Sequence, residues 1–184
     1  MRLSNKLSRI LSATSITLVY IFIIFTSKFA TSKPDEPCTK IISKSVIQNY
    51  KLVPHYKDLE NALDKYKAGD IICLSDGNAK NISIFDFNGG KKYLTIRPLN
   101  YLSTVIANKK YSGTGITIKG STGIIIKGLI VTGGLFAIKI VDSSNIKLSS
   151  NLIFNVGNEA ILINPKAYGG MNYLINDNII FDTG

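Results

Sequence analysis

The sequence is poor in the side chains that most often build metal centres and histidine-dependent active sites. It has one histidine, His55, and two cysteines, Cys38 and Cys73, among 184 residues. The two cysteines do not have the spacing of a metal site, and His55 precedes the repeats described below, so the repeats offer no histidine base for a nucleophile. Long polar tracts are also missing, and 45% of the residues are hydrophobic, which argues against a disordered chain. We expect one globular domain.

Basic residues are numerous but do not form a cluster. Four of the 22 lie in the segment 1–30, which leaves 18 basic and 12 acidic residues, a net charge of +6, in residues 31–184. The lysines are scattered and do not alternate with aromatic residues, so no nucleic acid partner is expected. An acidic polysaccharide or an anionic cell surface is a better match, and ordinary solubility is the other explanation.

The N-terminal segment, residues 1–30, has the pattern of an export signal. Three basic residues precede an uncharged stretch, residues 10–27, that contains ITLVYIFIIF. Ala30 is the best cleavage position, but Lys28 stands where a small residue is expected. Residues 1–30 therefore predict a signal peptide or an uncleaved membrane anchor through residues 10–27, with a buried core helix as a third alternative. Both main alternatives predict a secreted or cell-surface protein.

A linker and one helix are expected between this leader and the repeats. Residues 31–54 contain three prolines and indicate a linker and lead-in. Residues 56–68, YKDLENALDKYKA, place two tyrosines and two leucines on one face at helical spacing, and Gly69 follows as a stop. In an exported protein Cys38 and Cys73 can form one disulfide that staples this end of the domain; two buried free thiols are the alternative.

Beyond Gly69 the chain consists of short apolar runs separated by Gly, Asn, Asp and Ser, as is typical of short strands joined by tight turns. Three families of run recur in step: 115–118, 137–140 and 160–163; 129–131, 152–154 and 179–181; and 124–126, 146–148 and 173–175. A repeat this short leaves no room for a helix. It predicts a coil that turns once per repeat and pairs each strand with its copy one rung, about 4.8 Å, along the axis. A leucine-rich repeat has a similar period, but the LxxLxLxxN register is missing.

The alignment of the runs also predicts which residues stack from rung to rung. Two inward columns are expected, Ile116, Ile138 and Ile161 in one and Ile118, Ile140 and Ile163 in the other. Asn151 and Asn178 share one turn, with Gly128 in that place one rung earlier. The two asparagine amides are therefore expected to form a hydrogen-bonded ladder.

These repeats resemble those of the right-handed parallel β-helix proteins of the pectate lyase-like superfamily. The resemblance covers residues 56–184, through AGDIICLSDG, KYLTIRP, GITIKGSTGIIIKGLIVTGG and NIKLSSNLIFNVGNEAILI. It implies an all-β fold, a right-handed parallel β-helix (solenoid) over residues 55–184, with a capping α-helix at 56–68 and the hydrophobic leader helix before it. Members of the superfamily include polysaccharide lyases, glycoside hydrolases, epimerases, adhesins and phage tailspikes, so the fold alone does not select an activity.

The resemblance places a polysaccharide groove over the first strand of each coil and the loop before it. The central outward residues would be Thr117, Lys139 and Leu162, of which only Lys139 is ionisable. A lyase that acts on uronic acids needs a base to remove the proton alpha to the carboxylate. Lys139 is therefore the candidate base or carboxylate-binding cation; an ordinary solvated lysine is the alternative.

Polar residues along the same side complete the candidate site. The candidate catalytic residues are Lys139, Glu159 and Asp182, and the candidate substrate-binding residues are Thr117, Lys139, Asp142 and Asn158. Turn positions favour acidic residues for ordinary reasons as well. The resemblance allows calcium as a cofactor, without indicating which residues would bind it.

The sequence thus predicts an exported β-helix protein, secreted or anchored at the surface, that resembles polysaccharide lyases and acts on or binds an acidic glycan. The alternatives are a non-catalytic surface module for carbohydrate binding or adhesion, and an inactive fragment of a longer enzyme. The last residues, 182–184, stop where the preceding rung continues through residues 155–163. We therefore expect missing later rungs and self-association through an open C-terminal rung.

Overall fold

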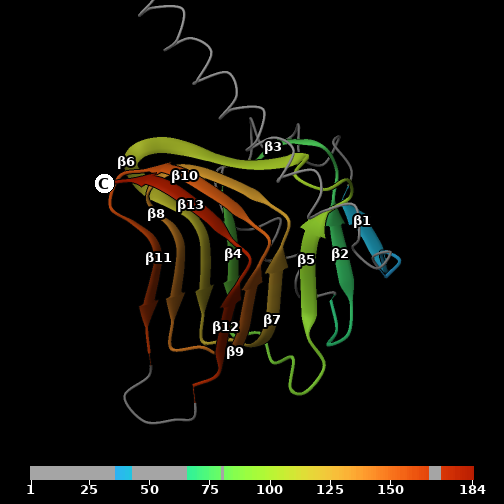
Figure 1. Cartoon of the computed structure of the whole chain (residues 1–184). Helices are drawn as coiled ribbons and strands as arrows, with labels where there is room; N and C mark the ends of the chain where they lie inside the picture. Colours follow the sequence, from blue (N-terminus) through green and yellow to red (C-terminus); the bar gives the residue numbers. More distant parts are fainter. Residues whose placement is uncertain (1–35, 43–65, 80, 166–170) are drawn as a thin grey trace, which may run out of the picture. The chain divides into compact units, whose positions relative to one another are not determined.

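The computed structural model describes residues 36–42, 66–79, 81–165 and 171–184. The strands belong to the compact unit Pro37–Gly184 (Figure 1). The predicted leader, most of the predicted linker and residues 56–65 of the predicted capping helix lie outside the described residues, and the described end of that helix, residues 66–68, is not helical. Within the four described ranges, no helix is long and apolar enough to cross a membrane.

The described residues form thirteen strands. They are β1 (Lys40–Ile42), β2 (Ile71–Leu74), β3 (Gly77–Ala79), β4 (Ile82–Phe85), β5 (Leu94–Pro98), β6 (Thr104–Lys119), β7 (Thr122–Lys127), β8 (Ile130–Val141), β9 (Ser144–Ser149), β10 (Leu152–Val156), β11 (Glu159–Asn164), β12 (Tyr173–Asn176) and β13 (Ile179–Thr183).

Every strand pairs in parallel with its counterpart in a neighbouring rung, as the repeats predict. One sheet has the order β1-β2-β5-β7-β9-β12, and the other has the order β13-β10-β8-β6-β3, with β4 on β6 and β11 on β8. The long strand β8 serves two faces, because residues 130–132 pair with β10 and residues 136–141 pair with β11. The chain is therefore a parallel β-helix (Figure 1). Its right-handed sense stays a prediction, favoured because about 98% of crossovers between parallel strands are right-handed.

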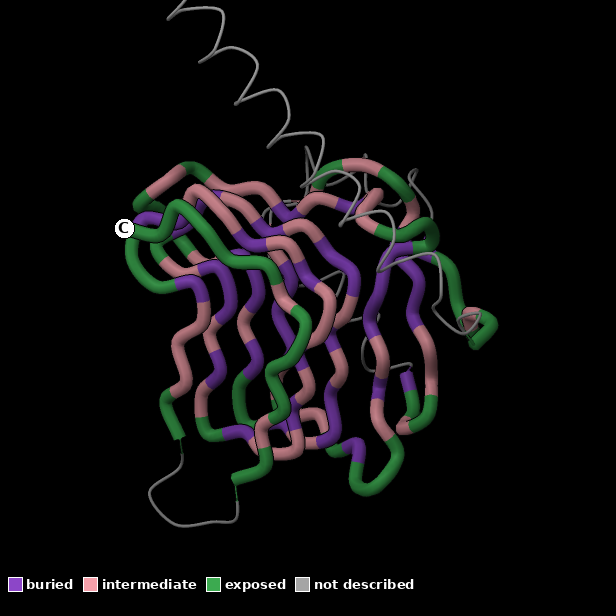
Figure 2. Tube along the Cα trace, in the orientation of Figure 1, coloured by how far each residue is buried: buried purple, intermediate pink, exposed green. Residues whose placement is uncertain are grey.

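The core consists of columns of apolar side chains from successive rungs. Ile116 pairs with Ile138 and Ile118 with Ile140, and all four are completely buried. Ile161 and Ile163 continue the two columns at the last rung, where they are only partly buried. Figure 2 shows the resulting alternation of buried and partly exposed residues along the strands. Each fully buried isoleucine contributes roughly 1.5–3 kcal/mol, so the inward pattern accounts for much of the stability.

The corners between strands are stacks of residues with positive φ. After the first strand family the stack is Asp86, Gly120 and Asp142, with φ of 52°, 62° and 49°; after β7 and its copies it is Gly128, Ser150 and Asp177, with φ of 69°, 56° and 55°. Glycine adopts this left-handed conformation without a Cβ clash, and Asp and Asn tolerate it better than other residues. The Gly, Asp, Asn and Ser residues between the apolar runs therefore place the corners.

The predicted ladder needs one correction. The Asn151 Nδ2 donates to Asn178 Oδ1 at 2.9 Å, but the rung before Asn151 is occupied by Leu129, whose backbone N–H donates to Asn151 Oδ1 at 3.1 Å. Gly128 instead aligns with Ser150 at the left-handed corner position. The predicted alignment of the internal repeats was therefore wrong by one residue in the family of β10. Residues 130–132, not 129–131, pair with β10.

A disulfide joins the N-terminal strand segment to the body of the solenoid. The Sγ atoms of Cys38 and Cys73 are bonded at 2.02 Å across a sequence separation of 35 residues. Strand β1 pairs with β2 beside this bond. Tyr66, the last apolar residue of the predicted helical face, is buried in the same core.

Candidate functional site

The candidate site is the outer face of the first strand family, which is formed by β4, the second halves of β6 and β8, and β11. The register places Ser83, Thr117, Lys139 and Leu162 in one outward row. Ser83 is buried, whereas the other three are partly exposed. The accessible part of this face therefore belongs to the rungs of Thr117, Lys139 and Leu162.

Lys139 lies beside an aromatic ring on this face. Its Nζ is 5.5 Å from the ring centroid of Phe136, which precedes it on β8. Lys119 is exposed and lies two residues beyond Thr117, the partner of Lys139. This face thus presents the ammonium groups of Lys139 and Lys119 and the aromatic ring of Phe136.

The predicted acidic residues do not gather around Lys139. Glu159 pairs with Phe136 at the start of the strand, and Asp142 lies at the corner beyond its end. The extended chain from Phe136 to Asp142 spans about 20 Å. None of the described carboxylates forms an ion pair with Lys139. Glu159 and Asp142 therefore flank the face at opposite ends.

Asp142 acts on a different residue. Burial raises the pKa of the Tyr173 hydroxyl, and the negative charge of Asp142 raises that pKa further. The Tyr173 hydroxyl donates to the backbone carbonyl of Ser143. Asp142 thus acts electrostatically on the corner that leads into β9.

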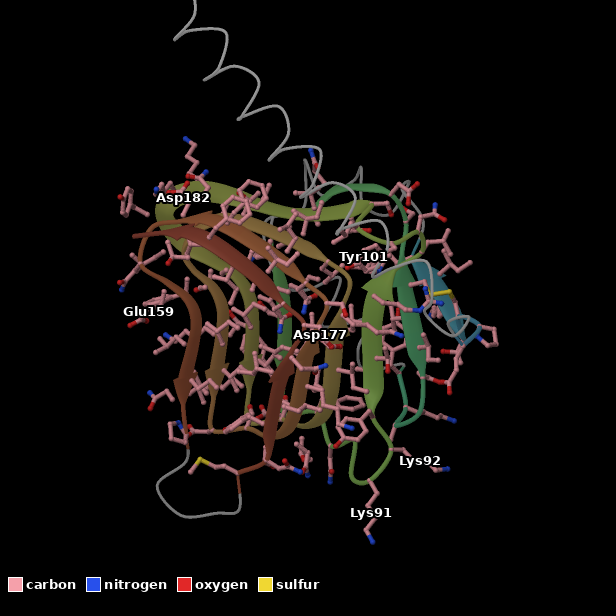
Figure 3. All side chains as sticks on the ribbon, in the orientation of Figure 1. Lys91, Lys92, Tyr101, Glu159, Asp177 and Asp182 are labelled. Carbon is pink, nitrogen blue, oxygen red and sulfur yellow. A yellow bond between two sulfur atoms is a disulfide. The ribbon has the colours of Figure 1, made fainter. Side chains whose placement is uncertain are left out.

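Asp182 and Asn158 lie near the opposite corner, where β11 begins. The carboxylate of Asp182 is 3.6 Å from the Nζ of Lys110, with 60% and 32% of the two side chains exposed. Asn158 is exposed, and its backbone N–H donates to the carbonyl of Leu135. Figure 3 shows Asp182 and Glu159 on the same side of the molecule.

The sequence reasoning missed an irregular stretch of β6 that passes over the next two rungs at this corner. Residues 108–113, here called the axial loop, are the part of β6 in which its pairing with β8 shifts register twice, on either side of the Lys110–Gly134 pair. A Cβ at Gly133 would lie 1.8 Å from the carbonyl oxygen of Asn108, and a Cβ at Gly157 would lie 2.5 Å from Cδ1 of Tyr111. The loop therefore passes over the two following rungs, which only glycine permits at these positions.

Tyr111 is held by this loop in an unusual conformation. Its φ is 62°, which costs a non-glycine residue on the order of 1–2 kcal/mol, yet 65% of its surface is exposed. The Nζ of Lys110 is 5.6 Å from its ring centroid. The one sequence signal for this arrangement was the stretch NKKYSG, which is longer than the corresponding turns of later rungs.

Metal ligands do not converge in this part of the chain. The described residues contain no group of three or more His, Cys, Asp or Glu side chains that could hold a metal ion. Calcium, which the resemblance allows, therefore stays a prediction without an assigned site.

Comparison with known proteins gives one structural neighbour. No family model matches the sequence, and no curated protein matches it. The crystal structure of an alginate lyase from Paenibacillus sp. str. FPU-7 is similar at 22% sequence identity with a TM-score of 0.49, over 79% of this chain and 44% of that chain. This chain thus spans less than half of the length of that enzyme. The strand register described above establishes this chain as a parallel β-helix, the fold that its repeats resemble in the pectate lyase-like superfamily.

Proposed function

We propose that this chain is an exported β-helix protein that binds an acidic polysaccharide on the outer face of its first strand family. The observation that carries the proposal is the Lys139–Phe136 pair, in which an ammonium group lies 5.5 Å from an aromatic ring on an accessible strand face. A uronic acid residue offers the complementary groups. The C–H groups of its ring can contact the negative face of the aromatic ring, and its carboxylate can accept a charge-assisted hydrogen bond from the lysine.

Binding agrees better with the geometry than cleavage does. A lyase needs a base at the alpha carbon and a separate group that neutralises the substrate carboxylate. Lys139 is the one ionisable residue of the outward row, and Glu159 and Asp142 lie at the two ends of the strand. Lys139 can serve only one of these two roles. Binding of a substrate carboxylate, unlike lyase catalysis, does not require a second catalytic group.

Export is proposed on two independent grounds. Residues 1–30 have the basic and apolar order of a leader. The Cys38–Cys73 disulfide is of a kind that persists in oxidising compartments and is rare in the cytosol. An extracellular or surface location also brings the protein to polysaccharides.

The test is a calorimetric titration of the full chain with polygalacturonate, alginate and neutral dextran at low and high salt. We expect binding to the two acidic polymers alone, weakened by salt. Lys139→Gln should lower the affinity about tenfold, the effect of losing one charge-assisted hydrogen bond. Lys91→Gln is the matched control, since Lys91 is exposed in the loop before β5, away from Glu159 and Asp182 (Figure 3).

Two outcomes would overturn the proposal. Equal affinity of Lys139→Gln and the unmodified chain would place the binding surface elsewhere. Release of unsaturated, ultraviolet-absorbing ends from either acidic polymer would show a lyase, and loss of that activity in Lys139→Gln would make Lys139 a catalytic residue.

A further inference from the structure

We propose that the axial loop supplies a second uronate subsite, formed by Tyr111 and Lys110, beside the one at Phe136 and Lys139. This inference rests on the proposed binding of an acidic polysaccharide and specifies how many sugar residues the face recognises. It follows from four features of the loop: its chemistry, its position, its strained conformation and its ion pair with Asp182.

The chemistry of the Lys139–Phe136 pair is repeated in the loop. The Nζ of Lys110 is 5.6 Å from the ring centroid of Tyr111, against 5.5 Å for Lys139 and Phe136. Each pair offers an aromatic face and an ammonium group, the groups that a uronic acid residue needs. At these distances the ammonium group lies near the ring without close contact, so a rotamer change can turn it to a carboxylate at the ring's edge.

The positions of the two pairs allow one polymer to reach both. Tyr111 lies against Gly157, whose N–H donates to the carbonyl of Gly134 at 2.8 Å. Gly134 is two residues before Phe136, so Tyr111 and Phe136 are separated by one rung and two residues. The chain bends at Gly134, whose φ is 84°, so one strand spacing and at most two extended residues place Phe136 within roughly 12 Å of Gly157, the residue that Tyr111 contacts. The two subsites therefore lie on consecutive rungs at one corner of the face.

The conformation of Tyr111 is not explained by stability. A positive φ is unfavourable for a bulky residue, and the ring it holds is mostly exposed to water. Both Gly133 and Gly157 lack the Cβ that would push the loop away. Strained residues that persist in this way cluster at binding and active sites, and an exposed aromatic ring on a held backbone is a preorganised contact.

Asp182 then acts as a competitor of the ligand. Its carboxylate is 3.6 Å from the Nζ of Lys110, and both side chains are accessible. Exposed ion pairs of this kind are weak, so a uronate carboxylate can displace Asp182 from Lys110. This role is opposite to the catalytic one predicted from the sequence, because removal of the Asp182 charge should strengthen binding.

The experiment measures the affinity of the full chain for uronate oligosaccharides of increasing length. Tyr111→Ala and Lys110→Gln should remove most of the affinity gained between the disaccharide and the hexasaccharide, while disaccharide binding at Lys139 stays unchanged. Tyr111→Phe keeps the ring and should bind like the unmodified chain. Asp182→Asn should raise hexasaccharide affinity by about two- to fivefold, and asparagine tolerates the left-handed φ of this position.

A third lysine–aromatic pair provides the matched control. The Nζ of Lys147 is 4.2 Å from the ring centroid of Tyr93, and Lys147 lies on β9 of the other sheet. This ammonium group already covers the ring, and Lys147→Gln should leave the affinity for every oligosaccharide unchanged. Circular dichroism of each variant checks that the β-helix is folded.

The results separate this inference from the function on which it rests. If the unmodified chain binds no acidic oligosaccharide, the proposed function fails and the subsite fails with it. If the unmodified chain binds but Tyr111→Ala keeps the full gain with length, only the second subsite is refuted. A weaker hexasaccharide affinity of Asp182→Asn would refute the competition at Lys110.

Discussion

Asn151 is almost completely buried, with 1% of its surface exposed, and its side chain joins three rungs. The Oδ1 atom accepts a hydrogen bond from the N–H of Leu129 at 3.1 Å, and Nδ2 donates to the carbonyl of Ile126 at 3.1 Å and to Asn178 Oδ1 at 2.9 Å. Replacing Asn151 with leucine, which has a similar size, removes all three bonds. The backbone groups of Leu129 and Ile126 would then lose these partners inside the core.

The magnitude follows from these groups. Each buried backbone group that loses its partner costs about 1–3 kcal/mol, and burial of a leucine side chain returns about 1.5–3 kcal/mol. With two such groups, the net loss for Asn151→Leu is about 2 kcal/mol. Asn151→Asp tests the Nδ2 donor separately. The carboxylate can still accept the hydrogen bond from the Leu129 N–H, but its second oxygen replaces Nδ2 and faces two acceptors, the Ile126 carbonyl and Asn178 Oδ1. A protonated carboxyl group can donate, so acidification should restore part of the stability of this variant.

Urea unfolding of the full chain, followed by far-ultraviolet circular dichroism, measures the effect. With a slope of about 2 kcal/mol per molar urea, the midpoint of Asn151→Leu should fall by about 1 M. Asn164→Leu is the matched control, because Asn164 is exposed on β11, and its midpoint should hardly change. Equal midpoints for the two variants would show that the amide ladder does not stabilise the stacked rungs.

Three further predictions concern the ends and the corners of the solenoid. Reduction of the Cys38–Cys73 disulfide, which closes a loop of 35 residues, should lower the free energy of unfolding by up to about 4 kcal/mol, and a double alanine variant should no longer respond to reductant in the urea assay. Burial raises the pKa of Tyr101 to about 12, above the ordinary value of about 10. The contribution of the protonated Tyr101 hydroxyl to the free energy of unfolding should therefore be complete below pH 10 and lost as the pH rises through 12. Alkaline unfolding curves of Tyr101→Phe should lack that loss. Ile180 and Phe181 are 44% and 52% exposed on β13, so light scattering should show that the chain self-associates. A variant with lysine at both positions should be monomeric. A monomer of the unmodified chain at every concentration would contradict this prediction.

The outward row was predictable for the same reason as the core. Strand side chains alternate between faces, so Lys139 had to point outward once Ile138 and Ile140 pointed inward. The same register also bears on the acidic residues. Glu159 comes directly before the run 160–163 and Asp142 comes two residues after the aligned run 137–140, so their places at opposite ends of the face follow from the repeats as well.

The parallel β-helix and its inward columns were predictable from the repeats alone. This was possible because the rung is a local unit, and one period of the repeat contains the strands, the corners and the alternation of one complete turn. Three features could be found only in the folded chain: the one-residue shift of the ladder, the course of the axial loop and the partner of Lys110. Each depends on residues from different rungs, as when Tyr111 lies against Gly157 and Lys110 reaches Asp182. A repeat pattern specifies how each rung pairs with the next, but the direction of an irregular loop depends on where the following rungs leave room for it.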